Sequence, residues 1–174
     1  MNHIVIIGFM GSGKTRVGKR LAQDLELPFV EVDKSISKKM GMNINDIFQK
    51  FGEPYYRALE TLTIKELAGS KERMVVSLGA GLPMQEQNQQ LIPALGTVVY
   101  IKGSVDTLLK RLEDTNNPMT EEENYQDKIR RMLKQRDPVY QKFADITVRT
   151  GTKPFEDLVA EIEEQIKQVS EKNS

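Results

Sequence analysis

The stretch "GFMGSGKT", which follows the short apolar run "IVII", constrains the fold of this chain more than any other feature. It matches the pattern G-x-x-x-x-G-K-[ST] at Gly8, Gly13, Lys14 and Thr15. Backbone N–H groups of such a loop, and those of the helix that follows, point at phosphate oxygens, so the loop has to connect a strand to a helix. The apolar run before it and the helical period after it meet this condition. The sequence therefore predicts a site for ATP or GTP.

The same loop suggests roles for its residues. The Lys14 ammonium can neutralise phosphate charge, and the Thr15 hydroxyl can ligate Mg²⁺. We expect the nucleotide to be bound by Gly11, Ser12, Gly13, Lys14, Thr15 and Arg16. None of these residues indicates which molecule receives the phosphate.

Composition excludes several other classes of protein. A chain of 174 residues, 39% of them hydrophobic, predicts a single domain over residues 1–174. Lys and Arg together number 25, as do Asp and Glu, so no net field attracts nucleic acid or an anionic membrane. There is no cysteine, and no apolar run is long enough for a signal peptide or a membrane span. We expect a cytoplasmic protein without nucleic-acid or membrane partners.

Short β-branched runs alternate with segments of helical period, which is the pattern of a parallel sheet with helices on both faces. The expected strands are residues 4–7, 28–32, 74–78, 97–101 and 146–149. The expected helices are residues 15–25, 36–51, 55–67, 85–92, 105–112, 126–143 and 155–169. The prediction is an α/β fold with five parallel strands.

Local signals add detail to these elements. Gly41 predicts a break in the second helix, with a new start capped by Asn43 or Asn45. Pro138 predicts an early end of the helix that begins at residue 126, which would leave Arg136 projecting from the last turn. His3 is expected on the surface, ahead of the first strand. The polar residues 113–124 form either a plain surface loop or a mobile flap.

Two carboxylates lie at the C-terminal end of the second expected strand. Glu31 and Asp33 share one face by the period of a strand, at the edge of the sheet where ligands of open α/β folds bind. One can hold Mg²⁺ through water, while the other accepts a hydrogen bond from an attacking hydroxyl. The alternative is a solvated turn that happens to contain two acids.

Three further groups have both a structural and a functional interpretation. Arg57 and Glu60 lie one helical turn apart, and form either an exposed salt bridge or an oriented guanidinium that grips a small anion. The glycines around Ala80 allow either a tight turn or the close approach of a ligand. Arg136 is either an ordinary cation near a helix end or an anion ligand. Spacing alone leaves these alternatives open.

Taken in order, these stretches resemble the shikimate kinase family, P-loop kinases of the nucleoside monophosphate kinase-like class, over residues 4–169. Besides the phosphate loop and the two acids, "YRALE", "GAG" and "RDPVY" correspond to motifs of that family. The resemblance implies phosphorylation of the 3-hydroxyl of shikimate with ATP and Mg²⁺, a step toward chorismate and the aromatic amino acids. It also implies a helical substrate-binding insert at about residues 34–60 and a flap at about residues 112–124.

The resemblance assigns the site residues as well. Asp33 would orient or deprotonate the hydroxyl, with Lys14 and Arg57 as its catalytic partners, and Thr15 with Glu31 would serve Mg²⁺. The nucleotide would also contact Arg111. The acid would be bound by Asp33, Arg57, Gly79, Ala80, Gly81 and Arg136. We expect a monomer whose partner is this small molecule.

Three positions depart from the family pattern. Asn117 stands where the family flap has an arginine, a loss of charge that Lys110 or Arg111 would have to replace. Glu31 replaces an aspartate, and Ala80 replaces a glycine. Two alternatives therefore remain beside a shikimate kinase: a kinase of the same fold for another small hydroxylated acid, and a nucleotide-binding protein that has lost transfer.

Overall fold

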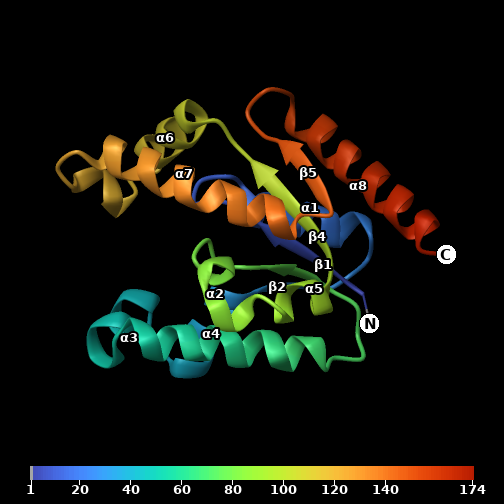
Figure 1. The fold of residues 1–174 in the computed structure, drawn as a ribbon, viewed down its shortest axis with the longest axis horizontal. Helices are drawn as coiled ribbons and strands as arrows, with labels where there is room; N and C mark the ends of the chain where they lie inside the picture. Colours follow the sequence, from blue (N-terminus) through green and yellow to red (C-terminus); the bar gives the residue numbers. More distant parts are fainter. Residues whose placement is uncertain (1) are drawn as a thin grey trace.

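A parallel five-stranded sheet lies at the centre of the computed structural model, which describes residues 2–174 (Figure 1). All pairings are parallel, in the order β2-β3-β1-β4-β5. The strands are β1 (His3–Ile7), β2 (Phe29–Glu31), β3 (Val75–Ser77), β4 (Gly96–Lys102) and β5 (Ile146–Arg149). The predicted α/β class and its five parallel strands are confirmed.

Helices cover both faces of this sheet. They are α1 (Lys14–Asp24), α2 (Val32–Met40), α3 (Ile44–Phe51), α4 (Glu53–Ala68), α5 (Leu91–Leu95), α6 (Val105–Asp114), α7 (Tyr125–Phe143) and α8 (Phe155–Lys172), with 3-10 turns η1 (Leu82–Met84), η2 (Glu86–Asn88) and η3 (Pro118–Glu121). None of the helices within residues 2–174 has the length and apolar character needed to cross a bilayer.

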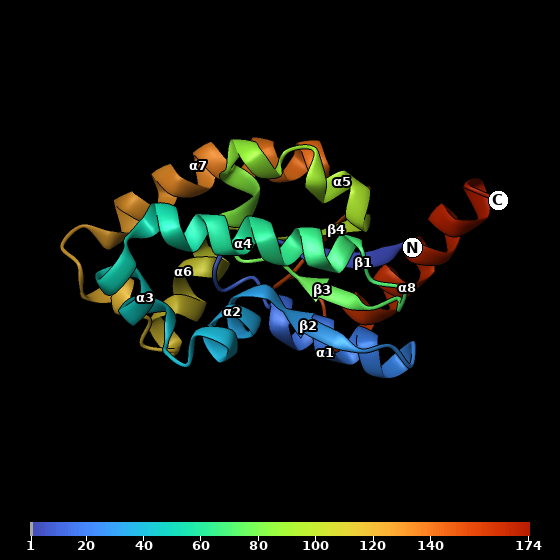
Figure 2. The same cartoon turned by 90° about the horizontal axis from the view of Figure 1, so that it is seen from below.

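The two faces of the sheet have separate cores. Successive side chains of a strand point to opposite faces, so Ile4 and Ile6 pack with α1 and α8, whereas Val5 and Ile7 join the larger cluster formed by the other helices. Figure 2 shows α1 below the sheet and α4, α5 and α7 above it. Because all the strands are parallel, their carboxyl ends lie at one edge of the sheet, where the phosphate loop, Glu31 and the turn after β3 are found.

The break within the second expected helix is confirmed. α2 ends before Gly41, which adopts the left-handed conformation with φ 64°. The side chain of Asn43 then accepts a hydrogen bond from the Asp46 N–H at 2.9 Å and caps α3. Of the two capping candidates, Asn43 is the cap and Asn45 is not.

Three expectations are wrong. No single helix spans residues 85–92: the chain forms η1, η2 and the short α5, because the buried Asn88 side chain binds the Leu82 carbonyl at 3.0 Å and holds the segment in tight turns. α7 passes Pro138 and continues to Phe143, since Pro138 is exposed while Tyr140 and Phe143 anchor the last turns in the core. His3 is fully buried in β1, and its ring nitrogens contact the Leu67 carbonyl at 2.8 Å and the Met74 N–H at 3.2 Å.

Candidate active site

The phosphate loop leaves the carboxyl end of β1 and enters α1 at Lys14. Gly11 and Gly13 have φ values of 80° and 93°, a conformation that favours glycine. The first N–H groups of α1 lack partners within the helix and face the loop. The Lys14 ammonium donates to the carbonyls of Gly8 at 3.0 Å and Phe9 at 3.1 Å. Loop, helix end and lysine together form an anion-binding site.

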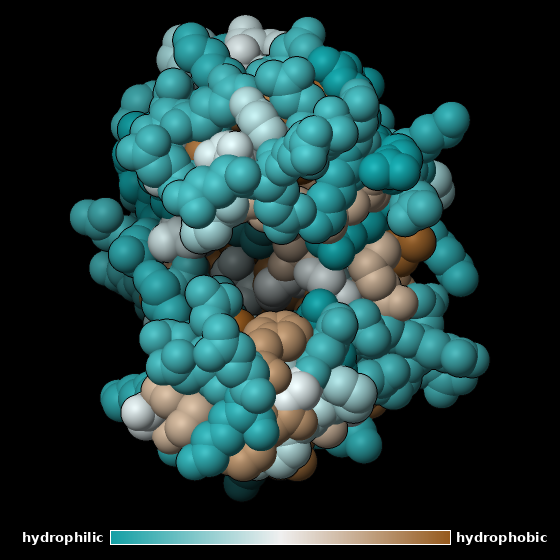
Figure 3. All heavy atoms as spheres, turned by 90° about the vertical axis from the view of Figure 1, so that its left-hand side faces the viewer, coloured by the Kyte–Doolittle hydropathy of each residue, from teal (hydrophilic) through white to brown (hydrophobic). Residues whose placement is uncertain are grey.

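A cleft of about 640 Å³ opens beside this loop. It joins the carboxyl ends of three neighbouring strands, and its lining residues are Met10, Gly11, Gly13, Lys14, Thr15, Arg16, Lys19, Glu31, Asp33, Ser77, Leu78, Gly79 and Ala80. Figure 3, seen from the side that carries α3 and α6, shows a surface hollowed between an upper and a lower lobe. The structure thus brings part of the predicted set to one cavity: most of the phosphate-loop residues, Glu31, and Asp33 with Gly79 and Ala80.

Thr15 and Glu31 form an oxygen-donor pair in this cleft. The Thr15 hydroxyl donates to the Glu31 carboxylate, whose other oxygen lies 2.7 Å from the Lys34 ammonium. Partial burial by itself would raise the pKa of Glu31, but the hydrogen bonds from Lys34 and Thr15 outweigh it, and the net pKa is below the usual value. Glu31 is therefore ionised at neutral pH. The longer glutamate side chain still reaches the threonine of the loop.

Asp33 sits in the first turn of α2, one residue beyond the buried Val32. Its carboxylate accepts a hydrogen bond from the Lys34 N–H at 2.7 Å and is exposed along the cleft.

The charges of Asp33 and Glu31 favour the protonated form of the Lys14 ammonium. Burial has the larger effect and, together with Arg136, lowers the pKa of Lys14 to about 8. The cleft therefore holds a lysine that titrates close to neutrality.

Arg57 and Glu60 form a buried pair on α4. The Arg57 Nη1 atom lies 2.6 Å from a Glu60 oxygen, and the Glu60 side chain is only 1% exposed. Glu53 adds a longer contact to Arg57 Nε at 3.3 Å. Burial raises the pKa of Glu60, and the Arg57 charge opposes that rise. The interpretation of Arg57 and Glu60 as an exposed salt bridge is wrong, because the Glu60 carboxylate that pairs with the guanidinium is buried.

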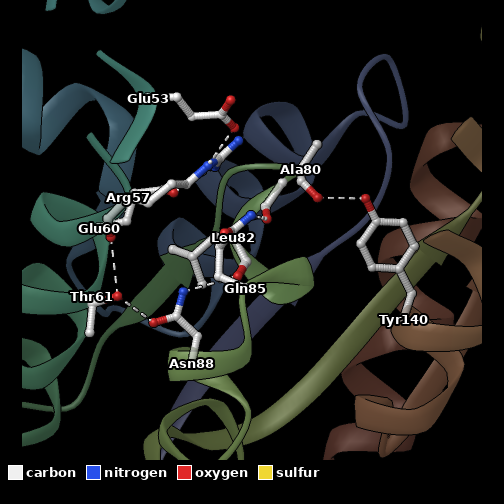
Figure 4. A network of polar contacts seen from close by, with 10 residues as sticks. Glu53, Arg57, Glu60, Thr61, Ala80, Leu82, Gln85, Asn88 and Tyr140 are labelled. Atoms are coloured by element: carbon white, nitrogen blue, oxygen red, sulfur yellow. Dashed lines mark hydrogen bonds and ion pairs between the residues drawn. The ribbon is translucent and has the colours of Figure 1, made fainter. Parts of the chain in front are cut away.

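The glycine turn after β3 packs directly against this pair. A Cβ atom on Gly81 would come within 2.6 Å of the Arg57 guanidinium, and one on Gly79 within 3.2 Å of a Glu60 oxygen. Figure 4 shows Arg57 and Glu60 on one side of the turn and Tyr140 on the other. A side chain at position 81 would therefore displace the Arg57 guanidinium from its present place.

Arg136 approaches from α7. It is half-buried, and its guanidinium carbon lies 5.7 Å from the centre of the Phe9 ring in the phosphate loop. Neither Arg57, Gly81 nor Arg136 lines the cleft of about 640 Å³ itself. One turn beyond Arg136, the Tyr140 hydroxyl donates to the Ala80 carbonyl at 2.7 Å. The two arginines therefore lie on helices that contact the same turn.

A second cleft, of about 370 Å³, lies on the other side of the phosphate loop. Ser12 lines it, together with Arg16, Arg111, Thr150 and Phe155. The Arg16 guanidinium carbon is 3.8 Å from the centre of the Phe155 ring. The buried Ser12 hydroxyl has no hydrogen-bond partner among residues 2–174. The sequence did not predict Thr150 and Phe155 as lining residues of a cleft. Only their position after the last strand could have indicated it.

Arg111 is fastened to the phosphate loop. Its Nη1 atom donates to the carbonyls of Gly11 at 3.2 Å and Ser12 at 3.1 Å, and its Nη2 atom donates to the Thr150 hydroxyl at 2.9 Å. These three bonds hold the guanidinium at the second cleft. Arg111 is therefore bound to the phosphate loop and to Thr150.

Asn117 has a local structural role in the loop between α6 and α7. Its side-chain oxygen accepts a hydrogen bond from the Met119 N–H at 3.0 Å and caps η3. The Tyr125 hydroxyl donates to Glu113 at 2.5 Å and joins the two ends of this loop. Asn117 thus orders the loop without adding charge.

The fold and the site define a P-loop kinase for a small acceptor. The family model described as shikimate kinase matches residues 10–167, and the chain belongs to the shikimate kinase family. It is 40% identical to a shikimate kinase of Thermodesulfovibrio yellowstonii, over 90% of both chains. It is 36% identical to one of Enterococcus faecalis, over 97% of this chain and 100% of that one.

Solved structures show the same relationship. Shikimate kinase from Acinetobacter baumannii in complex with shikimate superposes with a TM-score of 0.87, at 36% identity and over 97% of this chain and 94% of that one. A gluconokinase from Sinorhizobium meliloti gives a TM-score of 0.58 at 19% identity, over 98% of this chain and 94% of that one. The second likeness shows the fold alone.

Proposed function

We propose that this protein transfers the γ-phosphoryl group of ATP to the 3-hydroxyl of shikimate. The observation that carries the proposal is the Arg57–Glu60 pair packed against the turn after β3, on the edge of the sheet that carries Asp33. A guanidinium held by a buried carboxylate is a pre-oriented ligand for a second carboxylate. The family to which the chain belongs supplies the identity of that acid.

Each site residue then has a defined task. Arg57 and Arg136 bind the carboxylate of the acid, and the backbone N–H groups of residues 79–81 bind it from the side of the turn. Asp33 accepts a hydrogen bond from the attacking hydroxyl and takes its proton. Lys14 stabilises the charge on the transferred phosphoryl group.

The nucleotide spans the two clefts. Its phosphates bind the loop and the end of α1, and its base binds in the second cleft between the cationic side chains Arg16 and Arg111 and the aromatic Phe155. The protein works in the cytoplasm as a monomer. Its only substrates are the nucleotide and the small acid.

The donors present fit Mg²⁺. Thr15 and Glu31 offer two adjacent oxygens in the cleft, and Mg²⁺ takes one or two protein oxygens and completes its shell with water and substrate phosphates. No group of three or more His, Cys, Asp or Glu side chains capable of holding a metal occurs in residues 2–174, which is consistent with a metal that arrives with the nucleotide. When bound, Mg²⁺ supplies charge neutralisation at the phosphates.

The lowered pKa of Lys14 gives a pH dependence for nucleotide binding. The protonated lysine binds phosphate, so MgADP affinity is constant below about pH 7.5 and falls as the pH rises through the pKa of about 8, by at most roughly tenfold per unit. Isothermal titration between pH 7 and 9.5 measures this. Lys14→Met should bind MgADP more weakly, with an affinity that does not fall between pH 7 and 9.5. An equal fall in that variant would assign the titration to another group.

The proposed function is tested by ADP release from MgATP with shikimate, quinate or gluconate. Of the three acids, we expect only shikimate to give turnover with MgATP. Turnover with another acid and none with shikimate favours the second candidate, a kinase of the same fold for a different hydroxy acid, which Asn117 and Ala80 support. MgADP binding without any turnover favours a nucleotide-binding protein that has lost transfer.

A further inference from the structure

The turn at residues 79–82 presents backbone donors that the protein itself does not use. Within residues 2–174, neither the Ala80 N–H nor the Gly81 N–H donates a hydrogen bond. The Leu82 N–H, by contrast, donates to the Gly79 carbonyl at 3.1 Å. Free backbone donors beside a guanidinium are suited to a carboxylate ligand, provided that the peptide planes are held in one orientation.

Tyr140 fixes one of these peptide planes. Its hydroxyl donates to the Ala80 carbonyl at 2.7 Å, a contact between residues sixty positions apart. The ring is fully buried and packs on the ring of Tyr100 with centroids 5.1 Å apart and an angle of 42°. Burial raises the pKa of Tyr140 to about 12, so the hydroxyl keeps its proton and donates at any physiological pH.

The geometry of the peptide bond transmits this contact to the other side of the turn. In a planar trans peptide the carbonyl oxygen and the next N–H point in opposite directions, and residues 2–174 contain no cis peptide. Because the Ala80 oxygen points at Tyr140, the Gly81 N–H points away from α7. Arg57 lies on that side, against Gly81 (Figure 4).

The far end of the turn is anchored independently on α4. The Asn88 side-chain nitrogen donates to the Leu82 carbonyl at 3.0 Å, and its oxygen accepts from the Thr61 hydroxyl at 2.7 Å. Asn88 is completely buried. The turn is therefore restrained at Leu82 from α4 and at Ala80 from α7, and within residues 2–174 Tyr140 is the hydrogen-bond partner of the peptide between Ala80 and Gly81.

We propose that Tyr140 is a positioning residue for the acceptor: its hydroxyl holds the Ala80–Gly81 peptide so that the Gly81 N–H and the Arg57 guanidinium bind the same carboxylate. Tyr140 does not touch the substrate. The proposal rests on the proposed function in one respect, namely that the carboxylic acid binds at this turn.

The test is Tyr140→Phe, which removes the hydroxyl and keeps the ring. We expect the KM for shikimate to rise about tenfold and kcat to change less than threefold, because the free carbonyl lets the peptide rotate. The Kd of MgADP should stay within about twofold of the original protein. Tyr100→Phe is the matched control: it removes a buried hydroxyl that donates to Asp137 at 2.6 Å in the same ring pair. It should lower the melting temperature similarly and leave the shikimate KM within about twofold.

A second measurement does not depend on turnover. Hydrogen–deuterium exchange of a peptide covering residues 78–84 should be faster in Tyr140→Phe than in the original protein, and unchanged in Tyr100→Phe. Equal KM values in Tyr140→Phe and the original protein, or equal rises in both variants, overturn the proposal. Absence of shikimate turnover in the original protein refutes the proposed function instead, and unchanged exchange in Tyr140→Phe then overturns the positioning role by itself.

Discussion

Asp33→Asn is expected to lower kcat by a factor on the order of 10² to 10⁴ and to leave the Kd of MgADP within about twofold. An amide has nearly the shape of the carboxylate but cannot take a proton from the attacking hydroxyl at neutral pH. We assign this task to Asp33, because the other acid lining the cleft, Glu31, is engaged by Thr15 and Lys34. Steady-state ADP release gives kcat, and calorimetric titration gives the affinity.

Asp46→Asn provides the matched control for this change. Asp46 also occupies the first turn of a short helix, α3, but lies outside the cleft. The control should retain kcat within about twofold, since it makes the same neutralisation in the first turn of a helix outside the cleft. A loss of less than threefold in Asp33→Asn would mean that another group accepts the proton.

The parts of the fold that the sequence predicted are those determined locally. The phosphate loop carries its own glycines, lysine and threonine. The β-branched runs predict the ends of all five strands to within one or two residues. The pairing of Thr15 with Glu31 follows from topology, because parallel strands end at one edge. Arg57 and Glu60 were recognised as a pair by their helical spacing.

The wrong expectations depend on contacts between residues distant in sequence. His3 is buried because the Leu67 carbonyl and the Met74 N–H satisfy its ring, and neither lies near it in the chain. Pro138 is tolerated inside α7 because Tyr140 and Phe143 are buried beyond it. The contact of Tyr140 with Ala80 gives no local signal at all. Spacing showed that Glu60 can reach Arg57, but only the packing of α4 against the turn shows that Glu60 is buried.

That burial determines what Arg57→Ala does. We expect a loss of roughly 3–5 kcal/mol in the free energy of unfolding, because Glu60, 1% exposed, would lose the partner that lies 2.6 Å away. Shikimate binding would be lost as well. The pKa of Glu60, already raised by burial, rises further without the Arg57 charge. The folded variant then holds a proton that the unfolded chain releases, so its stability falls as the pH rises above the ordinary pKa of a glutamate. Urea unfolding at several pH values measures both effects.

The double variant Arg57→Leu/Glu60→Leu separates stability from function. Replacing a buried ion pair with apolar side chains is often neutral or stabilising, so the double variant should recover the free energy of unfolding and lose the pH dependence seen in Arg57→Ala. It should not recover shikimate binding, because no guanidinium faces the turn after β3. If the double variant binds the acid as the original protein does, the buried pair serves only the fold, and the carboxylate is bound elsewhere. Loss of binding at restored stability assigns the guanidinium to the acceptor and leaves Glu60 as the group that aims it.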